Sequence, residues 1–247
     1  MTEPELPTGK DPDDSLEEYD LPFLQAVALR VSVLVIGLLT RAADVLVLLV
    51  RPWLLRPYLG VWLAEILYPP YRPRGRTAVV TQALKGSGQG WRELIYGETP
   101  VFTALRLFRK AGVGRGSRVV DVLAGRGRAL LAARWLGAEA RGVELLVDHV
   151  ASVAGQLRPA GISLAVGDAT REDLGDATHV FVAWTALSPE TKTRLVERFR
   201  QCRPGTRFLL VTRPIEGEGF VALAQYRMLF TWGFETVWLQ EYRPGPV

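Results

Sequence analysis

Cysteine, histidine and lysine are all scarce in this sequence of 247 residues. The single Cys202 excludes an internal disulfide framework, and the two histidines, His149 and His179, lie too far apart for the usual metal-ligand spacings. We therefore predict an intracellular protein without a metal site. Only four of the 30 basic residues are lysines, and the formal net charge is +4. So small an excess does not indicate a nucleic-acid-binding protein.

Basic residues are also nearly absent from residues 1–20, where Lys10 stands against eight acidic residues. Together with the three prolines of this stretch, this composition predicts a disordered acidic tail. It excludes a secretory signal peptide, because such a peptide begins with basic residues and reaches its apolar core sooner.

Charge is sparse again between Leu21 and Leu55, where Arg41 and Asp44 interrupt two apolar runs. A helix through residues 31–50 would span about 30 Å, the thickness of a bilayer core. Arg41 and Asp44 would share one helix face, on which they could pair. Three interpretations are open: a transmembrane helix, a hairpin or amphipathic helix in the membrane interface, and a soluble helix packed on the rest of the protein.

Arginines and aromatic residues alternate after this apolar segment: Arg51, Trp53, Arg56, Tyr58, Trp62, Tyr68, Tyr71, Arg72, Arg74 and Arg76. The pattern is typical of the cytoplasmic boundary of a membrane. We expect a membrane-associated protein whose folded domain faces the cytoplasm, or a cytoplasmic protein if the segment packs on that domain. The stretch from Pro69 to Arg76 cannot continue a helix. It divides a hydrophobic helical segment (21–75) from one domain (76–247).

A strand, a tight glycine loop and a helix are predicted in succession within that domain. Residues 119–122 form a β-rich run, and apolar residues recur at helical spacing from 128 to 136. Gly125 and Gly127 lie between them, beside Ala124, and would let the backbone approach a ligand. The helix start then presents unpaired N–H groups to that ligand. The pattern predicts a nucleotide-binding loop.

Acidic residues fall where successive strands end. Asp121 ends the first strand, Glu144 ends a second strand over 140–145, and Asp168 follows a third over 162–166. A carboxylate after the second strand suits the two hydroxyls of a ribose. The loop lacks the third glycine of the dinucleotide fingerprint, and Asp121 suits an ammonium group. Each acid alone could cap a helix or face solvent, but the three in order favour S-adenosylmethionine over NAD(P), with Asp168 near the adenine amino group.

The remaining pattern alternates strands and helices. We predict a strand over 180–183, a helix from Ser188-Pro189 to about Arg200, a strand over 207–211, and a hairpin of 223–230 with 235–242. This predicts an α/β, Rossmann-like class I methyltransferase sheet with a C-terminal antiparallel hairpin, preceded by the hydrophobic helical segment.

The run Tyr96-Gly97-Glu98-Thr99 makes a family resemblance specific. With Gly142–Glu144, Pro189–Gly205 and Trp232-Gly233, it resembles the disruptor-of-telomeric-silencing type of histone-lysine methyltransferase. The apolar segment, Gly125–Arg128 and Gly142–Leu145 resemble the membrane-anchored lysine methyltransferases of the ATP synthase c subunit. The resemblance covers about residues 93–242. It implies that Tyr96, Glu98 and Thr99 belong to a loop that closes over S-adenosylmethionine.

Two departures from these families bear on the substrate. Leu123 replaces the first loop glycine, and Ala183-Trp184 replaces an asparagine pair after the fourth strand. The sequence also lacks the Asp/Asn-Pro-Pro-aromatic run of enzymes that methylate base amines, so nucleic acid is disfavoured. We expect N-methylation of a protein lysine, with Trp184 as the catalytic channel wall. The alternatives are a lipid or other membrane-soluble acceptor, and a non-catalytic membrane scaffold that binds S-adenosylmethionine.

Overall fold

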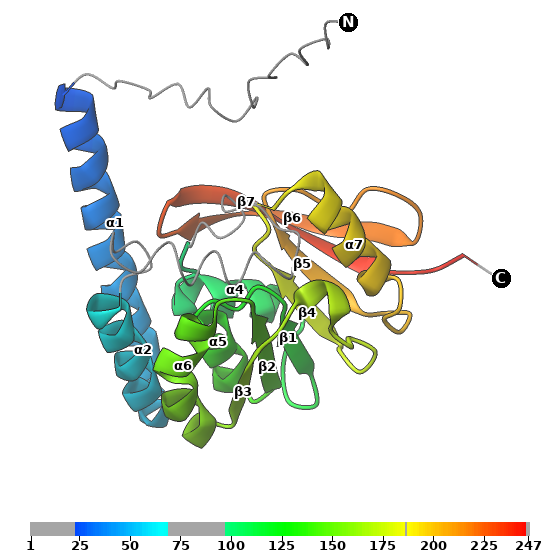
Figure 1. Ribbon diagram of the computed structural model, residues 1–247, viewed down its shortest axis with the longest axis horizontal. Helices are drawn as coiled ribbons and strands as arrows, with labels where there is room; N and C mark the ends of the chain where they lie inside the picture. The colour runs from blue at the N-terminus through cyan, green and yellow to red at the C-terminus, as the bar shows by residue number, and fades with distance from the viewer. Residues whose placement is uncertain (1–22, 69–96, 186, 246–247) are drawn as a thin grey trace, which may run out of the picture.

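The computed structural model describes residues 23–68, 97–185 and 187–245, and its centre is one seven-stranded sheet (Figure 1). The strands are β1 (Arg118–Asp121), β2 (Glu139–Glu144), β3 (Ile162–Val166), β4 (His179–Val182), β5 (Arg207–Val211), β6 (Phe220–Phe230) and β7 (Gly233–Tyr242). Their order in the sheet is β3-β2-β1-β4-β5-β7-β6. The first five are parallel, whereas β7 runs antiparallel to both β5 and β6.

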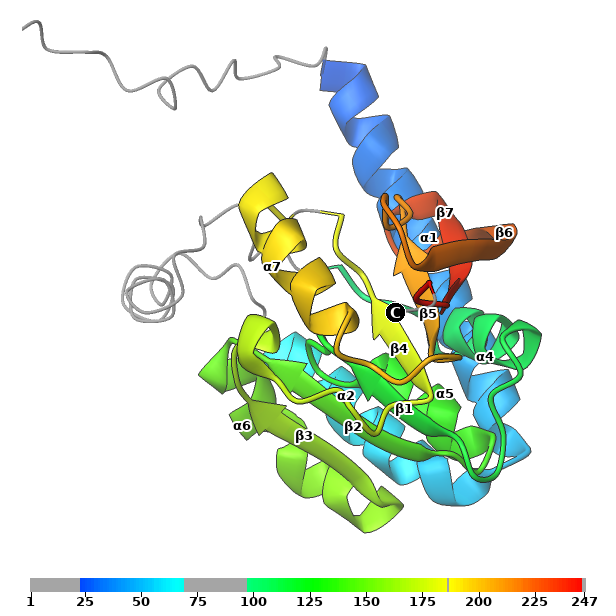
Figure 2. The ribbon, with the colours of Figure 1, turned by 90° about the vertical axis from the view of Figure 1, so that its right-hand side faces the viewer.

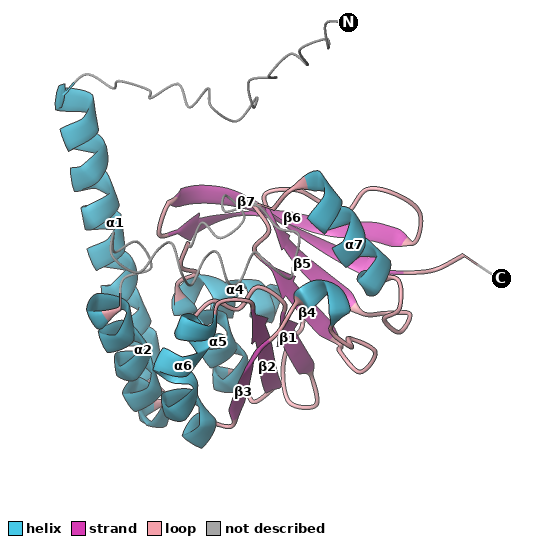
Figure 3. Cartoon of the chain, in the orientation of Figure 1, coloured by secondary structure: helices cyan, strands magenta, loops and turns pink. Residues whose placement is uncertain are grey.

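Helices cover both faces of this sheet (Figure 3). They are α1 (Phe23–Leu49), α2 (Leu55–Leu67), α4 (Val101–Lys110), α5 (Arg128–Trp135), α6 (Val147–Leu157) and α7 (Pro189–Phe199), with short 3-10 turns η2 (Pro52–Leu54), η4 (Arg158–Ala160) and η5 (Ala169–Arg171). Helix α7 lies on one face, and α4, α5 and α6 lie on the other (Figure 2).

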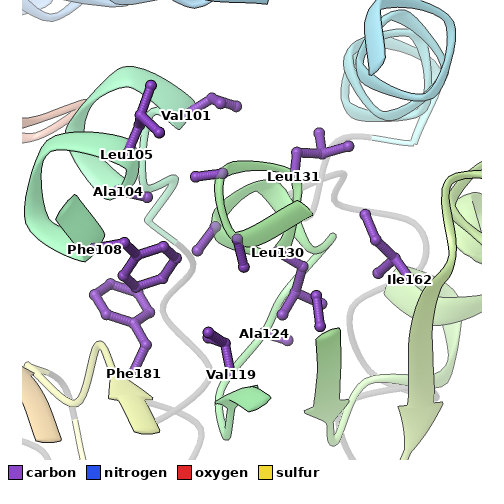
Figure 4. Close-up of a cluster of buried hydrophobic side chains, with 14 of the residues drawn as sticks. Val101, Ala104, Leu105, Phe108, Val119, Ala124, Leu130, Leu131, Ile162 and Phe181 are labelled. Atoms are coloured by element: carbon purple, nitrogen blue, oxygen red, sulfur yellow. The ribbon is translucent and has the colours of Figure 1, made fainter. Parts of the chain in front are cut away.

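Alternating side chains along the central strands fill two cores. In β1, Val119 belongs to the core under α4 and α5, and its neighbour Val120 belongs to the core under α7. This is the two-residue period of a strand that is buried on both faces. In the first core, the ring of Phe108 from α4 meets that of Phe181 from β4 edge-on, with centroids 5.8 Å apart (Figure 4).

The elements agree closely with the sequence pattern. The predicted strands over 162–166 and 207–211 are confirmed residue for residue, and the others differ by one to three residues at an end. The predicted cap is also confirmed, since the hydroxyl of Ser188 accepts a hydrogen bond from the N–H of Thr191 at 3.2 Å. Helix α6 was missed, although Val150, Val153 and Leu157 bury one of its faces.

The N-terminal helices pack on the α/β domain. Helix α1 packs against α4, and α2 packs against α6. Leu48, Leu54 and Tyr58 are fully buried in the same core as α4 and α5. Burying an apolar side chain of this size stabilises the fold by about 1.5–3 kcal/mol. The two helices therefore share the core of the domain, while the N-terminal end of α1 extends beyond its body (Figures 1 and 2).

The predicted transmembrane helix is not supported. Within residues 23–68, 97–185 and 187–245, no helix is both long enough and apolar enough to cross a membrane. Arg41 and Asp44, which could have paired with each other on one helix face, contact different partners on the domain. The predicted acidic tail (1–20) and the boundary near residue 75 lie outside the described residues.

Candidate functional site

The two acids predicted at strand ends lie at one edge of the sheet. Asp121 is the last residue of β1, and Glu144 is the last residue of the neighbouring β2. Both side chains are largely buried. Because parallel strands end at the same edge, this is where ligands bind in open α/β sheets.

Glu144 holds the backbone of two loops. One carboxylate oxygen accepts a hydrogen bond from the N–H of Gly125 at 2.8 Å, and the other accepts one from the N–H of Leu146 at 2.9 Å. Burial raises the pKa of Glu144, and these N–H donors oppose that rise. The carboxylate is therefore fixed against the glycine loop, at the position expected for a ribose acceptor.

The glycine loop requires its glycines. Gly127 has a φ of 78°, in the left-handed region, and directly precedes α5. A Cβ at this position would lie 2.9 Å from a methyl carbon of Leu157. A Cβ on Gly142, in β2, would lie 2.7 Å from the Cβ of Ala124. The loop therefore sits closer to β2 than side chains at these positions would permit.

Asp121 is a buried acid whose protonation is unusual. Burial raises the pKa of Asp121 to about 7, the N–H of Leu123 opposes the rise, and the charge of Glu144 adds to it. A buried acid with a raised pKa at the carboxyl edge of a parallel sheet is a functional-site candidate. A cation placed beside it would favour the carboxylate form.

The other predicted cofactor residues differ in their positions and partners. Asp168 follows β3, but one of its carboxylate oxygens accepts hydrogen bonds from the N–H and hydroxyl of Thr170. Thr99 is buried just before α4, and Ala124 is buried in the glycine loop. Tyr96 lies outside the described residues. Within the described part of the chain, no group of three or more His, Cys, Asp or Glu residues could hold a metal ion.

Trp184 follows β4 at the same edge, but its ring is only 3% exposed. It packs near Phe199 of α7, and its indole N–H donates to the carbonyl of Arg213 at 3.2 Å. These contacts are those of a core side chain beneath the sheet, so the channel wall expected here stays a prediction.

Comparisons with known proteins agree on this architecture. No protein-family model matches the sequence, and no curated protein matches it either. By structure, the chain is similar to TrmN from Thermus thermophilus, with a TM-score of 0.50 and 20% identity over 70% of this chain and 54% of TrmN. It is also similar to a protein of Pyrococcus horikoshii with a provisional RNA methyltransferase assignment, with a TM-score of 0.50 and 16% identity over 68% of this chain and 98% of that one.

The fold is that of the class I methyltransferases. The predicted Rossmann-like sheet with its C-terminal hairpin is thereby confirmed. The finer resemblance to the two lysine methyltransferase families is not confirmed by these matches and stays a prediction.

A buried ionic cluster joins the N-terminal helices to this methyltransferase sheet. Its centre is Arg128, the first residue of α5, whose side chain is only 2% exposed. The guanidinium forms a bidentate pair with Glu65 of α2, in which its Nε lies 2.7 Å from Oε1. It also lies 3.2 Å from Glu98 and 3.7 Å from Asp44 of α1. The residue that follows the glycine loop is thus held by three separate segments.

Other contacts extend the cluster. Arg41 of α1 lies 3.3 Å from Glu98 and 3.7 Å from Glu65. Asp44 accepts a hydrogen bond from the N–H of Phe102 at 2.9 Å and so caps α4, whose own N-cap residue is Pro100. Burial raises the pKa of Asp44 to about 6, and the Phe102 N–H and Arg128 oppose the rise. Three carboxylates therefore share two guanidinium groups.

The cluster includes one predicted site residue and one residue that the sequence did not single out. Glu98 pairs with Arg41 and Arg128 in this structure, and its expected role in binding the cofactor stays a prediction. Glu65 carried no motif and was missed, because its partner lies 63 residues away in the chain. A chain that began at the predicted boundary would leave Arg128 buried without Glu65 and Asp44.

We predict that Glu65→Ala destabilises the folded protein by about 3–5 kcal/mol, because the buried guanidinium of Arg128 loses its bidentate partner and two of its N–H groups lose their acceptor. Urea unfolding followed by circular dichroism measures this difference. Glu139→Ala, which removes an exposed glutamate at the start of β2, is the matched control and should change the stability by less than about 0.5 kcal/mol. Equal effects of the two variants would contradict the role of the cluster.

Proposed function

We propose that this protein is an S-adenosylmethionine-dependent methyltransferase. The observation that carries the proposal is the placement of Asp121, Glu144 and the Gly125–Gly127 loop together at the carboxyl edge of a class I methyltransferase sheet. Two buried carboxylates, one beside a glycine loop that leads into a helix, can hold a nucleoside with a cationic chain.

The side chains at this edge fit the parts of the proposed cofactor. Glu144 would accept hydrogen bonds from the two ribose hydroxyls, since carboxylate oxygens are acceptors only. Asp121 would face the ammonium of the amino-acid chain. The backbone of the glycine loop can approach closely because Gly127 carries no Cβ. Asp168 is proposed near the adenine amino group, with Tyr96, Glu98, Thr99 and Ala124 completing the cofactor loop.

When bound, the cofactor supplies a methyl group attached to a positively charged sulfur. An amine nitrogen can take this methyl group without a metal or a strong base. The protein then has to orient the acceptor and remove water from it. Burial of the acceptor in an apolar channel lowers the pKa of an amine and so favours its neutral, nucleophilic form.

For the acceptor we propose the amine of a protein lysine, which rests on the motif resemblance around Tyr96–Thr99. The absence from Ala183–Thr185 of the run used for base amines disfavours nucleic acid. Trp184 stays our candidate for the channel wall if its ring moves from the core. One alternative is a lipid or other membrane-soluble acceptor. A second, non-catalytic alternative is a membrane scaffold that only binds the cofactor. Radiolabel from labelled S-adenosylmethionine in protein, in lipid extract or in neither distinguishes the three.

We predict that the protein binds S-adenosylmethionine and that Glu144→Gln weakens binding about tenfold to a hundredfold. The amide keeps one acceptor oxygen for the loop but loses the charge, and a hydrogen bond to a charged group is worth about 1.5–3 kcal/mol. Isothermal titration calorimetry measures both affinities. Glu139→Gln, at the opposite end of the same strand, is the control and should bind normally. Absence of binding to the wild type would refute the proposed function.

We also predict that binding strengthens as the pH rises from 6 to 8. The pKa of Asp121 is raised to about 7, so below that value a proton must leave before the carboxylate can pair with the cofactor's ammonium. Affinity at pH 6 should be about tenfold below its plateau, at one factor of ten per pH unit. Asp121→Asn should bind weakly at both pH values. Equal affinities of the wild type at pH 6 and pH 8 would exclude this role for Asp121.

For the location of the protein we propose a membrane surface, with the methyltransferase domain in the cytoplasm. Opposite its buried side, α2 exposes an apolar stripe at helical spacing: Leu59, Trp62, Leu63, Ile66 and Leu67. Helix α1 exposes Leu34, Leu38, Leu46 and Leu49 among others. Arg51, between the two helices, and Arg56, in the first turn of α2, are also exposed. Continuous apolar surface with basic residues beside it suits the interface of an anionic bilayer.

We predict that the full-length protein sediments with vesicles of phosphatidylcholine and phosphatidylserine. The triple variant Leu59→Ser, Leu63→Ser and Ile66→Ser should lose most of this sedimentation, because it removes the apolar stripe of α2. Val221→Ser with Leu223→Ser, two exposed apolar positions on β6, is the matched control and should sediment normally. A full-length protein that stays in the supernatant with vesicles would contradict the proposed location.

A further inference from the structure

Four side chains gather at the carboxyl edge of the sheet on the side away from the predicted cofactor acids. Thr185 follows β4, Thr212 follows β5, and Trp232 and Glu235 lie at the turn into β7. Since β1 pairs with β4, β4 with β5, and β5 with β7, this group lies along the same edge as Asp121. It therefore lies beyond the cofactor residues, where an acceptor would meet the methyl donor.

Thr212 has an unusual backbone. Its φ is 81°, and it is the only residue other than glycine with a positive φ among the residues that the structure describes. A β-branched residue rarely adopts this strained conformation, and such outliers are found most often at functional sites. The Thr212 N–H donates to the carbonyl of Thr236 at 2.7 Å, which holds the turn. This conformation places the Thr212 hydroxyl 2.8 Å from that of Thr185.

Glu235 is the acidic member of the group. One of its carboxylate oxygens accepts from the indole N–H of Trp232 at 3.2 Å, and the other accepts from the Thr212 hydroxyl at 3.4 Å. Both donors are neutral, and across the described ranges Glu235 forms no ion pair with a lysine or arginine. Glu235 is half-buried, and among the described residues its carboxyl group meets these two neutral donors and no cation.

The group is also joined to the predicted cofactor loop. The hydroxyl of Thr231 accepts from the N–H of Glu98 at 3.2 Å and donates to the carbonyl of Glu98 at 3.0 Å. A Cβ on Gly97 would lie 2.6 Å from the ring of Trp232, so this ring packs directly on the loop. The indole that holds Glu235 is thus in contact with the segment expected to close over the cofactor.

From these contacts we infer that Glu235, with Trp232, Thr212 and Thr185, forms the binding site for the cationic amine of the methyl acceptor, a proposal that rests on the proposed methyltransferase function. The carboxylate pairs with an alkylammonium group and can then take its proton, which leaves the neutral amine that methyl transfer needs. The indole of Trp232, stacked on Phe230, holds the carboxylate in place. The two hydroxyls can accept hydrogen bonds from the remaining N–H groups. A primary amine is favoured over a neutral alcohol, because only the cationic form of the amine can form an ion pair with Glu235.

The test uses n-butylammonium chloride as the probe and n-butanol as its neutral isostere. Binding of each to the full-length protein is followed by saturation-transfer NMR, with and without saturating S-adenosylhomocysteine. We expect the ammonium to bind and the alcohol to bind at least tenfold more weakly. Glu235→Gln keeps the hydrogen bond from Trp232 but removes the charge, and it should weaken ammonium binding at least tenfold. Glu218→Gln, an exposed acid between β5 and β6, is the matched control.

The outcomes separate the two proposals. The acceptor site is overturned if the ammonium does not bind to the wild type. It is also overturned if the ammonium binds equally to the wild type and to Glu235→Gln, even when S-adenosylhomocysteine binds. Binding that depends on Glu235 supports the site, and so does its retention when Glu218 is changed. Failure of S-adenosylhomocysteine to bind overturns the methyltransferase proposal alone, because the ammonium measurement without it stands by itself.

Discussion

The buried charge of Arg128 is the constraint on which the arrangement of this protein depends. A guanidinium at the start of α5 cannot be buried unless carboxylates come to it, because an unpaired buried charge costs several kcal/mol. Here they come from α2, from α1 and from the loop before α4. The helix that follows the glycine loop, the N-terminal helices and the Glu98 loop are therefore fixed relative to one another.

This arrangement gives the N-terminal helices two different faces. The faces toward the domain carry Asp44, Glu65 and Tyr58, which bind or surround Arg128. The opposite faces expose leucines, Ile66 and Trp62. A segment of this composition can serve as part of the domain core and as a contact surface at once.

The acidic residues at the carboxyl edge of the sheet differ in how deeply they are buried. Asp121 and Glu144 are buried with raised pKa values, and backbone N–H groups hold them in place. Glu235 lies nearer the solvent, and among the described residues it accepts hydrogen bonds from an indole N–H and a hydroxyl. Such a division suits a reaction in which one cationic molecule is bound in the interior and a second approaches from outside. In the function proposed above, the strained backbone at Thr212 would lie between the two.

The sequence by itself determined the order and bounds of most elements, because strand and helix periods and turn residues are local properties. It also determined that Asp121 and Glu144 share an edge, since both end parallel strands. It could not determine that Arg41 and Asp44 turn inward, because an apolar run with two charges suits a bilayer and a protein surface alike. Only the tertiary structure brought Glu65 to Arg128, and Thr212 to Glu235. Those pairs lie 63 and 23 residues apart, and contacts between side chains at such separations leave no periodic signal in the chain.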